Sequence, residues 1–220
     1  KNIILTKEFL KNDFIPVGYD INTKQPVSFL FERKINIVSG INFDQIQIDF
    51  IDAIMRDMKQ LNKKVIVLDM AEAYEKNYGI LCYNKDFDNS FIKIYNELIT
   101  KKDEETYCFV LGAGYLKTKI TKAQPIVTKL FENLSNINVH FIFFDVYESI
   151  RGLQTEMWYQ NLEKNYGIWL GEGIANQSCI NVNKLSLDDR KLNFEYMAFV
   201  VDKNNYNVIK HVVDQEVEDE

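Results

Sequence analysis

Hydrophobic positions divide the chain into short apolar runs and longer stretches in which apolar residues recur every three or four positions. The runs are rich in Val, Ile and Phe, which is typical of strands buried on both faces of a sheet, and the longer stretches are typical of helices packed on such a sheet. The predicted core strands are Ile35–Val38, Lys64–Asp69, Tyr107–Gly112, Val139–Asp145, Gly167–Leu170 and, as a sixth, Ser178–Val182. The predicted helices are the stretch from Asp44 onward, Phe87–Lys101, Thr121–Leu134 and Thr155–Asn165.

This alternation predicts an α/β fold with a mainly parallel sheet that is covered by helices on both faces. Hairpins are expected before and after the core, formed by Phe14–Tyr19 with Pro26–Phe31 and by Phe194–Val201 with Tyr206–Val213. The predicted organisation is a lead-in at 1–33 outside the core, a domain at 34–213 and an acidic, disordered tail at 214–220. In a sheet of this kind, a ligand site is expected at the carboxyl ends of the strands.

The segment Lys34–Gln60 has the outline of a phosphate-binding strand, loop and helix, for which the Walker A pattern is G-x-x-x-x-G-K-[ST]. If Gly40 is the first glycine, Ile41-Asn42-Phe43-Asp44 fill the variable places. The second glycine, the lysine and the hydroxyl residue are then replaced by Gln45, Ile46 and Gln47. The lysine and the hydroxyl would bind phosphate and Mg²⁺, and the glycine would let backbone N–H groups approach the phosphates. The degenerate loop, with Gly40, Asn42, Asp44, Gln45, Ile46 and Gln47, is therefore predicted not to hold a nucleotide or a metal ion.

Composition narrows the class of protein further. A chain of 220 residues that is 46% hydrophobic can bury a core of its own. Its net charge of −6, without a cluster of Lys and Arg, disfavours nucleic-acid binding. Cys82, Cys108 and Cys179 are too far apart for a disulfide framework or a zinc site, and His140 and His211 lie in apolar runs typical of packed residues. The sequence therefore predicts no catalytic residue and no metal site.

Two short motifs and the order of the elements point to a family. Ile15-Pro16-Val17-Gly18-Tyr19-Asp20 precedes the first core strand, and Gly171-Glu172-Gly173 follows the fifth. With the terminal hairpin, this arrangement resembles the FtsK/SpoIIIE-type ATPase domains, specifically the last such domain of the type VII secretion coupling protein of the EssC/EccC family. The resemblance implies a RecA-like P-loop NTPase fold. It extends through most of the chain.

The third core strand departs from that family where an active member would carry Walker B acids that position Mg²⁺ and water. It ends in Leu111-Gly112-Ala113, without a carboxylate, so Gly112 and Ala113 mark a degenerate Walker B motif. Asp145, which ends the run Phe141–Asp145, is an alternative Walker B acid. The order of strands instead places Asp145 on the strand that serves as the sensor strand in the family.

The resemblance implies a module of a type VII secretion motor, at the cytoplasmic face of the bacterial cell membrane, as a soluble domain of a membrane-anchored protein. The loss of both Walker motifs predicts that this module is non-catalytic. ATP and Mg²⁺ are then expected only in neighbouring domains of the parent ATPase. The expected partners are secreted WXG100-type or other type VII substrates and the preceding ATPase domains of the same protein. The resemblance is also compatible with a hexameric parent protein. Neither nucleic-acid binding nor direct membrane insertion is expected.

Aromatic residues make strong anchors at interfaces, so Tyr147, Trp158 and Trp169 are candidates for binding a substrate peptide, the alternative being that they are ordinary core residues. Two further alternatives stay open. One is a weak ATP-binding or ATP-hydrolysing domain that uses backbone N–H groups at Asp44–Gln47. The other is an assembly or regulatory cap on the preceding ATPase domain.

Overall fold

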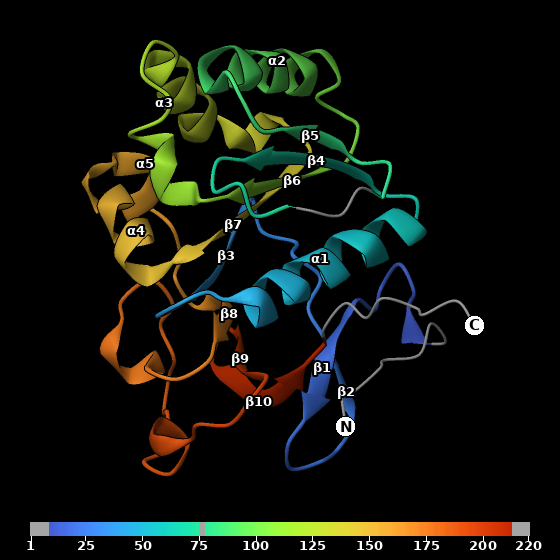
Figure 1. Cartoon of the computed structure of the whole chain (residues 1–220), viewed down its shortest axis with the longest axis vertical. Coiled ribbons are helices and arrows are strands. Elements are labelled where there is room, and N and C mark those ends of the chain that lie inside the picture. The colour runs from blue at the N-terminus through green and yellow to red at the C-terminus, as the bar shows by residue number, and fades with distance from the viewer. Residues whose placement is uncertain (1–8, 75–77, 213–220) are drawn as a thin grey trace.

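The structure is a computed structural model that describes residues 9–74 and 78–212. The described residues form one mixed sheet flanked by helices (Figure 1). The strands are β1 Pro16–Asp20, β2 Pro26–Ser28, β3 Ile35–Gly40, β4 Lys64–Asp69, β5 Leu81–Tyr83, β6 Thr106–Leu111, β7 Val139–Val146, β8 Tyr166–Leu170, β9 Met197–Asp202 and β10 Asn205–His211. The helices are α1 Gln45–Gln60, α2 Phe87–Thr100, α3 Gln124–Glu132, α4 Tyr147–Arg151 and α5 Met157–Gln160.

The sheet has the strand order β2-β1-β10-β9-β8-β3-β7-β6-β4-β5. In Figure 1 the order from β10 to β5 runs from bottom to top, and β1 and β2 lie to the right of β10. The strands from β8 to β5 are parallel to one another. The strands β9, β10, β1 and β2 then extend the sheet in antiparallel pairs. The predicted mainly parallel sheet and both hairpins are therefore confirmed. In this order β7 lies between β3, which carries the degenerate phosphate loop, and β6, which carries the degenerate Walker B position.

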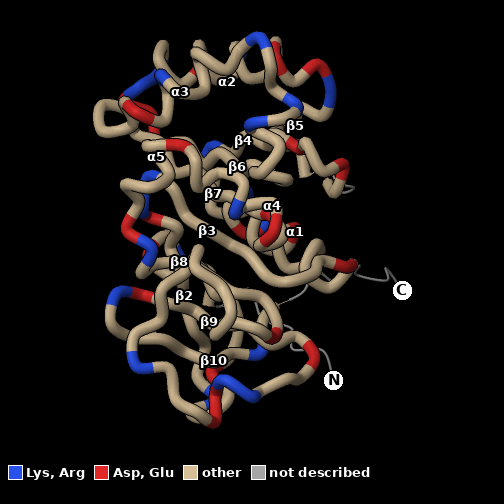
Figure 2. Tube along the Cα trace, turned by 90° about the vertical axis from the view of Figure 1, so that its left-hand side faces the viewer, with Lys and Arg blue, Asp and Glu red and all other residues tan. Residues whose placement is uncertain are grey.

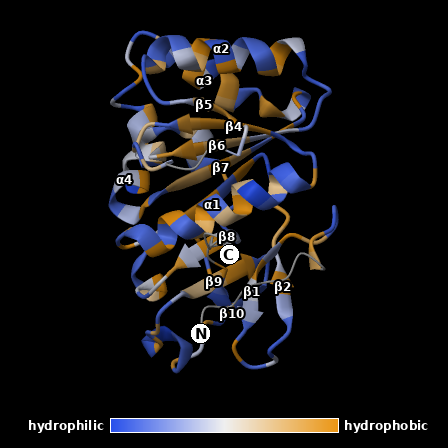
Figure 3. Ribbon diagram, turned by 45° about the vertical axis from the view of Figure 1, so that its right-hand side comes forward, coloured by the Kyte–Doolittle hydropathy of each residue, from blue (hydrophilic) through white to orange (hydrophobic). Residues whose placement is uncertain are grey.

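Two hydrophobic clusters lie on the two faces of the sheet. One face packs against the apolar stripe of α1, and the other packs against α2, α3, α4, α5 and the long β8–β9 connection. Figure 3 shows the apolar strands between these layers and the hydrophilic outer face of α1. Charged residues of both signs are spread over the outer surface rather than gathered in one field (Figure 2). Helices on both faces are thus confirmed, as the apolar patterns predict.

The lead-in is more deeply buried than predicted. Strand β1 pairs with both β2 and β10, so the hairpin is part of the main sheet. Ile15, Val17 and Phe31 have no exposed surface and pack in the same cluster as α1. This part of the segment 1–33 therefore belongs to the core, contrary to the prediction that the lead-in lies outside it. The predicted tail at 214–220 lies outside the described residues.

The predicted helix at Thr155–Asn165 is confirmed only over the four residues of α5, Met157–Gln160. Before it, the chain forms α4 and a 3-10 turn at Gly152–Thr155. The break occurs at Glu156, whose backbone is extended at φ −88° and ψ 127°. This break turns Trp158 and Tyr159 into the core, where both are buried. Burial of the two rings thus overrides the helical spacing.

The predicted strand at Ser178–Val182 is also wrong. The side chain of Gln177 accepts the Ile180 N–H at 2.8 Å and donates to the Ile180 carbonyl at 2.6 Å. One amide side chain therefore satisfies the backbone groups that a neighbouring strand would otherwise bind. Cys179 and Ile180 are buried without belonging to the sheet. The structure also contains β5, a three-residue edge strand that was not predicted because its sequence has no run of β-branched residues.

Candidate functional site

The corner between β3 and α1 occupies the position of a phosphate-binding loop. Gly40 ends β3, and α1 begins at Gln45. A Cβ atom on Gly40 would lie 2.5 Å from the Leu170 carbonyl oxygen of the neighbouring strand, so only glycine fits there. Phe43 fixes the middle of the loop by stacking on Phe144, with ring centroids 4.4 Å apart. The geometry of a strand, a tight loop and a helix is therefore kept.

The first turn of α1 is capped by the protein itself. The Asp44 carboxylate accepts the Ile46 N–H at 2.9 Å, and the Gln47 side chain accepts the Asp44 N–H at 2.9 Å, which completes a capping box. Gln45 donates to the Asp49 carboxylate at 2.8 Å. The N–H groups of Asp44 and Ile46, at the start of the helix where a phosphate would bind, are thus occupied by internal acceptors. An incoming phosphate would have to displace Asp44 and would meet its charge.

The end of β6 has no room for a Walker B carboxylate. Gly112 has φ +78°, and a Cβ atom there would lie 2.8 Å from the ring of Tyr115 and 3.0 Å from Ala71. Its N–H donates to the Phe144 carbonyl at 2.8 Å. The next residue, Ala113, is fully buried. The two degenerate positions therefore flank β7 on either side, and the one at the end of β6 is closed by packing.

Asp145 lies at the end of β7, between these two positions. Its carboxylate accepts the Gly114 N–H and the Val146 N–H, each at 2.8 Å, and its carbonyl accepts the Ser39 hydroxyl at 2.8 Å. Partial burial raises the pKa of the Asp145 carboxyl above its usual value. The side chain thus ties β7 to the loop after β6. Within residues 9–74 and 78–212, no group of three His, Cys, Asp or Glu side chains is arranged to hold a metal ion.

A pocket of about 230 Å³ opens beside the degenerate loop. It lies between Asn42, Asp44, Ile46 and Gln47 on one side and residues 171–172, 193–197 and His211 on the other. Glu172 and Glu195 join Asp44 in its wall. Glu172 belongs to the glycine-rich segment noted in the sequence. Nothing in the sequence around Glu195 predicts that it lines this pocket, because the pairing of β9 with β8 brings it there.

The structure separates the three aromatic candidates. Trp169 has no exposed surface, and its indole N–H donates to the Glu172 carbonyl at 2.8 Å. Tyr147 is half-buried and packs edge-on against Trp169 with a centroid distance of 6.1 Å. Trp158 is 6% exposed and stacks on Phe131 in the core. Both indole rings are buried and not accessible to a peptide. Of the three candidates, only Tyr147 has side-chain surface that a peptide could contact.

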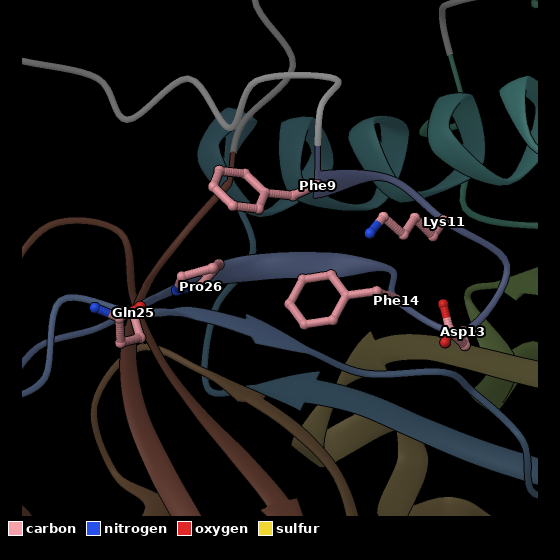
Figure 4. A pocket seen from close by; sticks show the side chains of 6 residues that line it. All are labelled: Phe9, Lys11, Asp13, Phe14, Gln25 and Pro26. Atoms are coloured by element: carbon pink, nitrogen blue, oxygen red, sulfur yellow. The ribbon is translucent and has the colours of Figure 1, made fainter.

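A second pocket, of about 370 Å³, lies beside the edge strand β2. Figure 4 shows Phe9, Phe14 and Pro26 around it, with Lys11, Asp13 and Gln25 at its borders. It is built by the lead-in and the β1–β2 turn rather than by the carboxyl ends of the parallel strands. It is therefore separate from the degenerate loop.

Comparisons with known proteins agree with this geometry. No family model matches the chain, and no curated protein matches it in sequence. Among solved structures, it resembles EssC (ATPases 2 and 3) from Geobacillus thermodenitrificans at 12% identity and a TM-score of 0.71, over 95% of this chain and 43% of that chain. It resembles Thermomonospora curvata EccC (ATPases 2 and 3) in complex with a signal sequence peptide at 13% identity and a TM-score of 0.67, over 92% of this chain and 41% of that one.

A third similar structure is the pCW3 conjugation coupling protein TcpA, at 8% identity and a TM-score of 0.64, over 96% of this chain and 70% of that chain. The chain spans less than half the length of the EssC and EccC chains that it matches. A search of the described helices for one long and apolar enough to cross a membrane found none. The chain thus has the fold of the type VII secretion ATPase domains of EssC and EccC, as its motifs and order of elements predict.

Proposed function

We propose that this chain is a non-catalytic, ATPase-like module of a type VII protein-secretion motor of the EssC/EccC kind. The observation that carries the proposal is the capped α1 terminus, where the Asp44 carboxylate accepts the N–H of Ile46, the residue at the lysine position. A lysine would add charge-assisted hydrogen bonds of roughly 1.5–3 kcal/mol each to a nucleotide. A helix terminus alone contributes about 0.3–1 kcal/mol, which is too little to hold MgATP against a resident carboxylate.

In this role the module engages secreted substrates, regulates the neighbouring ATPase domains, or does both. The EccC structure that contains a signal sequence peptide supports the first activity, and the multi-ATPase EssC and EccC chains support the second. The substrates would be WXG100-type or other type VII proteins. ATP and Mg²⁺ would be bound by other domains of a membrane-anchored parent, on its cytoplasmic side.

Calorimetry with MgATP at millimolar concentration tests the non-catalytic assignment directly. Residues 1–220 should give no saturable heat, because the loop lacks the lysine and the end of β6 lacks the Walker B acids. Saturable binding would favour the alternative of a weak ATP-binding or ATP-hydrolysing domain. ADP and inorganic phosphate serve as ligand controls, because an anion that binds at the helix terminus without nucleotide specificity would bind as phosphate does.

Substrate engagement and regulation are separated by two measurements. A labelled substrate tail is titrated against the chain alone and against the chain fused to its neighbouring ATPase domain, and saturable binding is expected in at least the fused form. The ATPase rate of the longer protein is then compared with and without residues 1–220. A pure substrate receptor leaves the basal rate unchanged, whereas a regulatory cap changes it.

A further inference from the structure

We propose that the pocket beside β2 binds a free α-amino acid that has an apolar side chain. The proposal goes beyond the proposed function and does not rest on it, because this pocket is separate from the degenerate loop. Three features support it: the apolar wall of the pocket, a pair of opposite charges at its rim and the turn that carries them.

The wall of the pocket is built by apolar side chains that the core does not use. Phe9, Phe14 and Pro26 line it, and all three are half-buried. Within the described ranges, neither phenylalanine is among the residues that form the two hydrophobic clusters or pack against them. An apolar ligand side chain would cover the two rings and remove their surface from water. The volume of about 370 Å³ also falls in the range of roughly 300–1,000 Å³ that is typical of small-ligand sites.

A cation and an anion stand at the rim of the pocket. Lys11 and Asp13 are both exposed, and neither side chain forms a hydrogen bond or an ion pair in the part of the chain that the structure describes. Figure 4 shows the Lys11 side chain extending toward the space between the two phenylalanine rings, with Asp13 on the same side of the pocket. A free α-amino acid carries a carboxylate and an ammonium on one carbon atom, so it can pair with Lys11 and Asp13 at the same time. The rim is thus complementary to a zwitterion.

A short closed turn holds these charges beside the apolar wall. The Lys11 N–H donates to the Phe14 carbonyl and the Phe14 N–H donates to the Lys11 carbonyl, each at 3.0 Å. Lys11, Asp13 and Phe14 therefore belong to one hydrogen-bonded unit, and Gln25 and Pro26 face it from the other side (Figure 4). Groups that are held in place before binding lose less freedom when a ligand arrives.

Other ligand classes fit this pocket less well. An extended peptide would have to pair with β2, which begins with a proline that has no N–H and lies beside a register shift between Pro16 and Gly18. A simple organic anion would leave Asp13 unmatched and close to a like charge, and a simple amine would do the same with Lys11. An amino acid satisfies both charges and fills the apolar wall with its side chain.

The test uses the ¹⁵N-labelled full chain, with L-leucine and L-phenylalanine as the probes and backbone amide shifts as the readout. Saturable shifts are expected at residues 9–14, 25 and 27. N-acetyl-L-leucine lacks the ammonium and L-leucinamide lacks the carboxylate, so each should bind about twofold to fivefold more weakly than L-leucine. Glycine lacks the apolar side chain and should give no saturable shift.

Two double variants locate the binding. Lys11→Gln/Asp13→Asn removes both rim charges without changing the net charge and should weaken L-leucine binding by about fivefold. Lys102→Gln/Asp103→Asn makes the same two changes at exposed positions between α2 and β6 and should bind as the parent does. A far-UV circular dichroism spectrum shows that each variant is folded, so a loss of binding can be attributed to the pocket.

Three results would overturn the proposal: no saturable shift with either probe, equal affinity for L-leucine and any of its three analogues, or an unchanged affinity in the Lys11→Gln/Asp13→Asn variant. Failure of the proposed function is seen separately, as saturable heat with MgATP. The two ideas can therefore fail independently.

Discussion

Asp44 Oδ1 accepts the backbone N–H of Ile46 across 2.9 Å, so a carboxylate of the protein itself caps the first turn of α1. The same residue therefore stabilises the helix behind it and, under the proposed function, opposes the binding of a nucleotide. A helix N-terminus favours negative charge through its dipole and its free N–H groups, and Asp44 supplies that charge from within the chain. Nucleotide is not needed to complete this corner of the fold.

Replacing Asp44 should destabilise the domain through the loss of this cap. Asp44→Ala is expected to lower the free energy of unfolding by about 0.5–2 kcal/mol, measured by urea denaturation. Asp44→Ser keeps an acceptor at the same position and should retain most of the stability. If the serine variant is as unstable as the alanine variant, the hydrogen bond to Ile46 is not the source of the effect.

Gly112 should tolerate no side chain. Its φ of +78° and the close approach of Tyr115 and Ala71 predict that Gly112→Ala costs about 1–3 kcal/mol. Gly152→Ala is the matched control, because Gly152 has helical φ and ψ angles and nothing lies within 4 Å of a Cβ atom there. The control should be neutral or slightly stabilising, and similar losses in both variants would contradict the steric explanation.

Asp145 should act through hydrogen bonding rather than through charge. Asp145→Ala leaves the Gly114 N–H without its acceptor and should cost about 1–3 kcal/mol at pH 7. Asp145→Asn keeps one acceptor oxygen, but the two oxygens of Asp145 accept separate N–H groups, so the variant should lose one of the two hydrogen bonds and lie between the parent and the alanine variant in stability. Because burial raises the pKa of Asp145 in the folded state, the carboxyl of the parent should lower stability as pH rises toward the folded-state pKa, and this pH dependence should be absent from the asparagine variant. An asparagine variant as unstable as the alanine variant would refute this role.

His211 should make the domain sensitive to acid. Burial lowers the pKa of His211 from 6.5 to about 4, so between these pH values the unfolded chain binds the proton and the folded chain does not. Stability is fully present above pH 6.5 and falls as pH drops toward 4, by roughly 1.4 kcal/mol for each unit of pKa difference. Urea denaturation at pH 7 and pH 4.5 measures the loss. His211→Gln should reduce it, whereas the control His140→Gln should keep it.

Both tryptophans should be shielded from solvent. Trp158 is 6% exposed and Trp169 has no exposed surface, so intrinsic fluorescence should be blue-shifted and poorly quenched by iodide. Phe131 and Phe143 pack on Trp158 from the same core cluster. Ready quenching of the folded chain would show that at least one indole is accessible, and would return the tryptophans to the set of peptide anchors.

The parts of the fold that depend on local patterns could be predicted from the sequence. The boundaries of β4 match the apolar run Lys64–Asp69, and α1 begins directly after the predicted Asp44. The departure of residues 40–47 from the Walker A pattern can likewise be read from the sequence, because that pattern is contiguous. These features need no knowledge of which segments meet in space.

What could not be predicted depends on contacts between distant segments. Glu195 enters the pocket because β9 returns antiparallel to β8, and nothing near Glu195 in the sequence indicates this. Aromatic residues at strand ends could be core residues or surface anchors, and only packing places Trp169 in the interior. The strand predicted at Ser178–Val182 was replaced by a loop because one side chain, Gln177, binds the backbone of Ile180.

The pairing of β1 with β10 has a mechanical consequence. Gly18 lies opposite His211 in an antiparallel ladder, so the two strands that approach the ends of the described chain are neighbours at one side of the sheet. A load that pulls on the segments preceding β1 and following β10 would act across this ladder and open it one hydrogen bond at a time, as a zipper opens. The parallel strands that carry the degenerate loop, β3 among them, would bear the load only after the antiparallel extension had been peeled away.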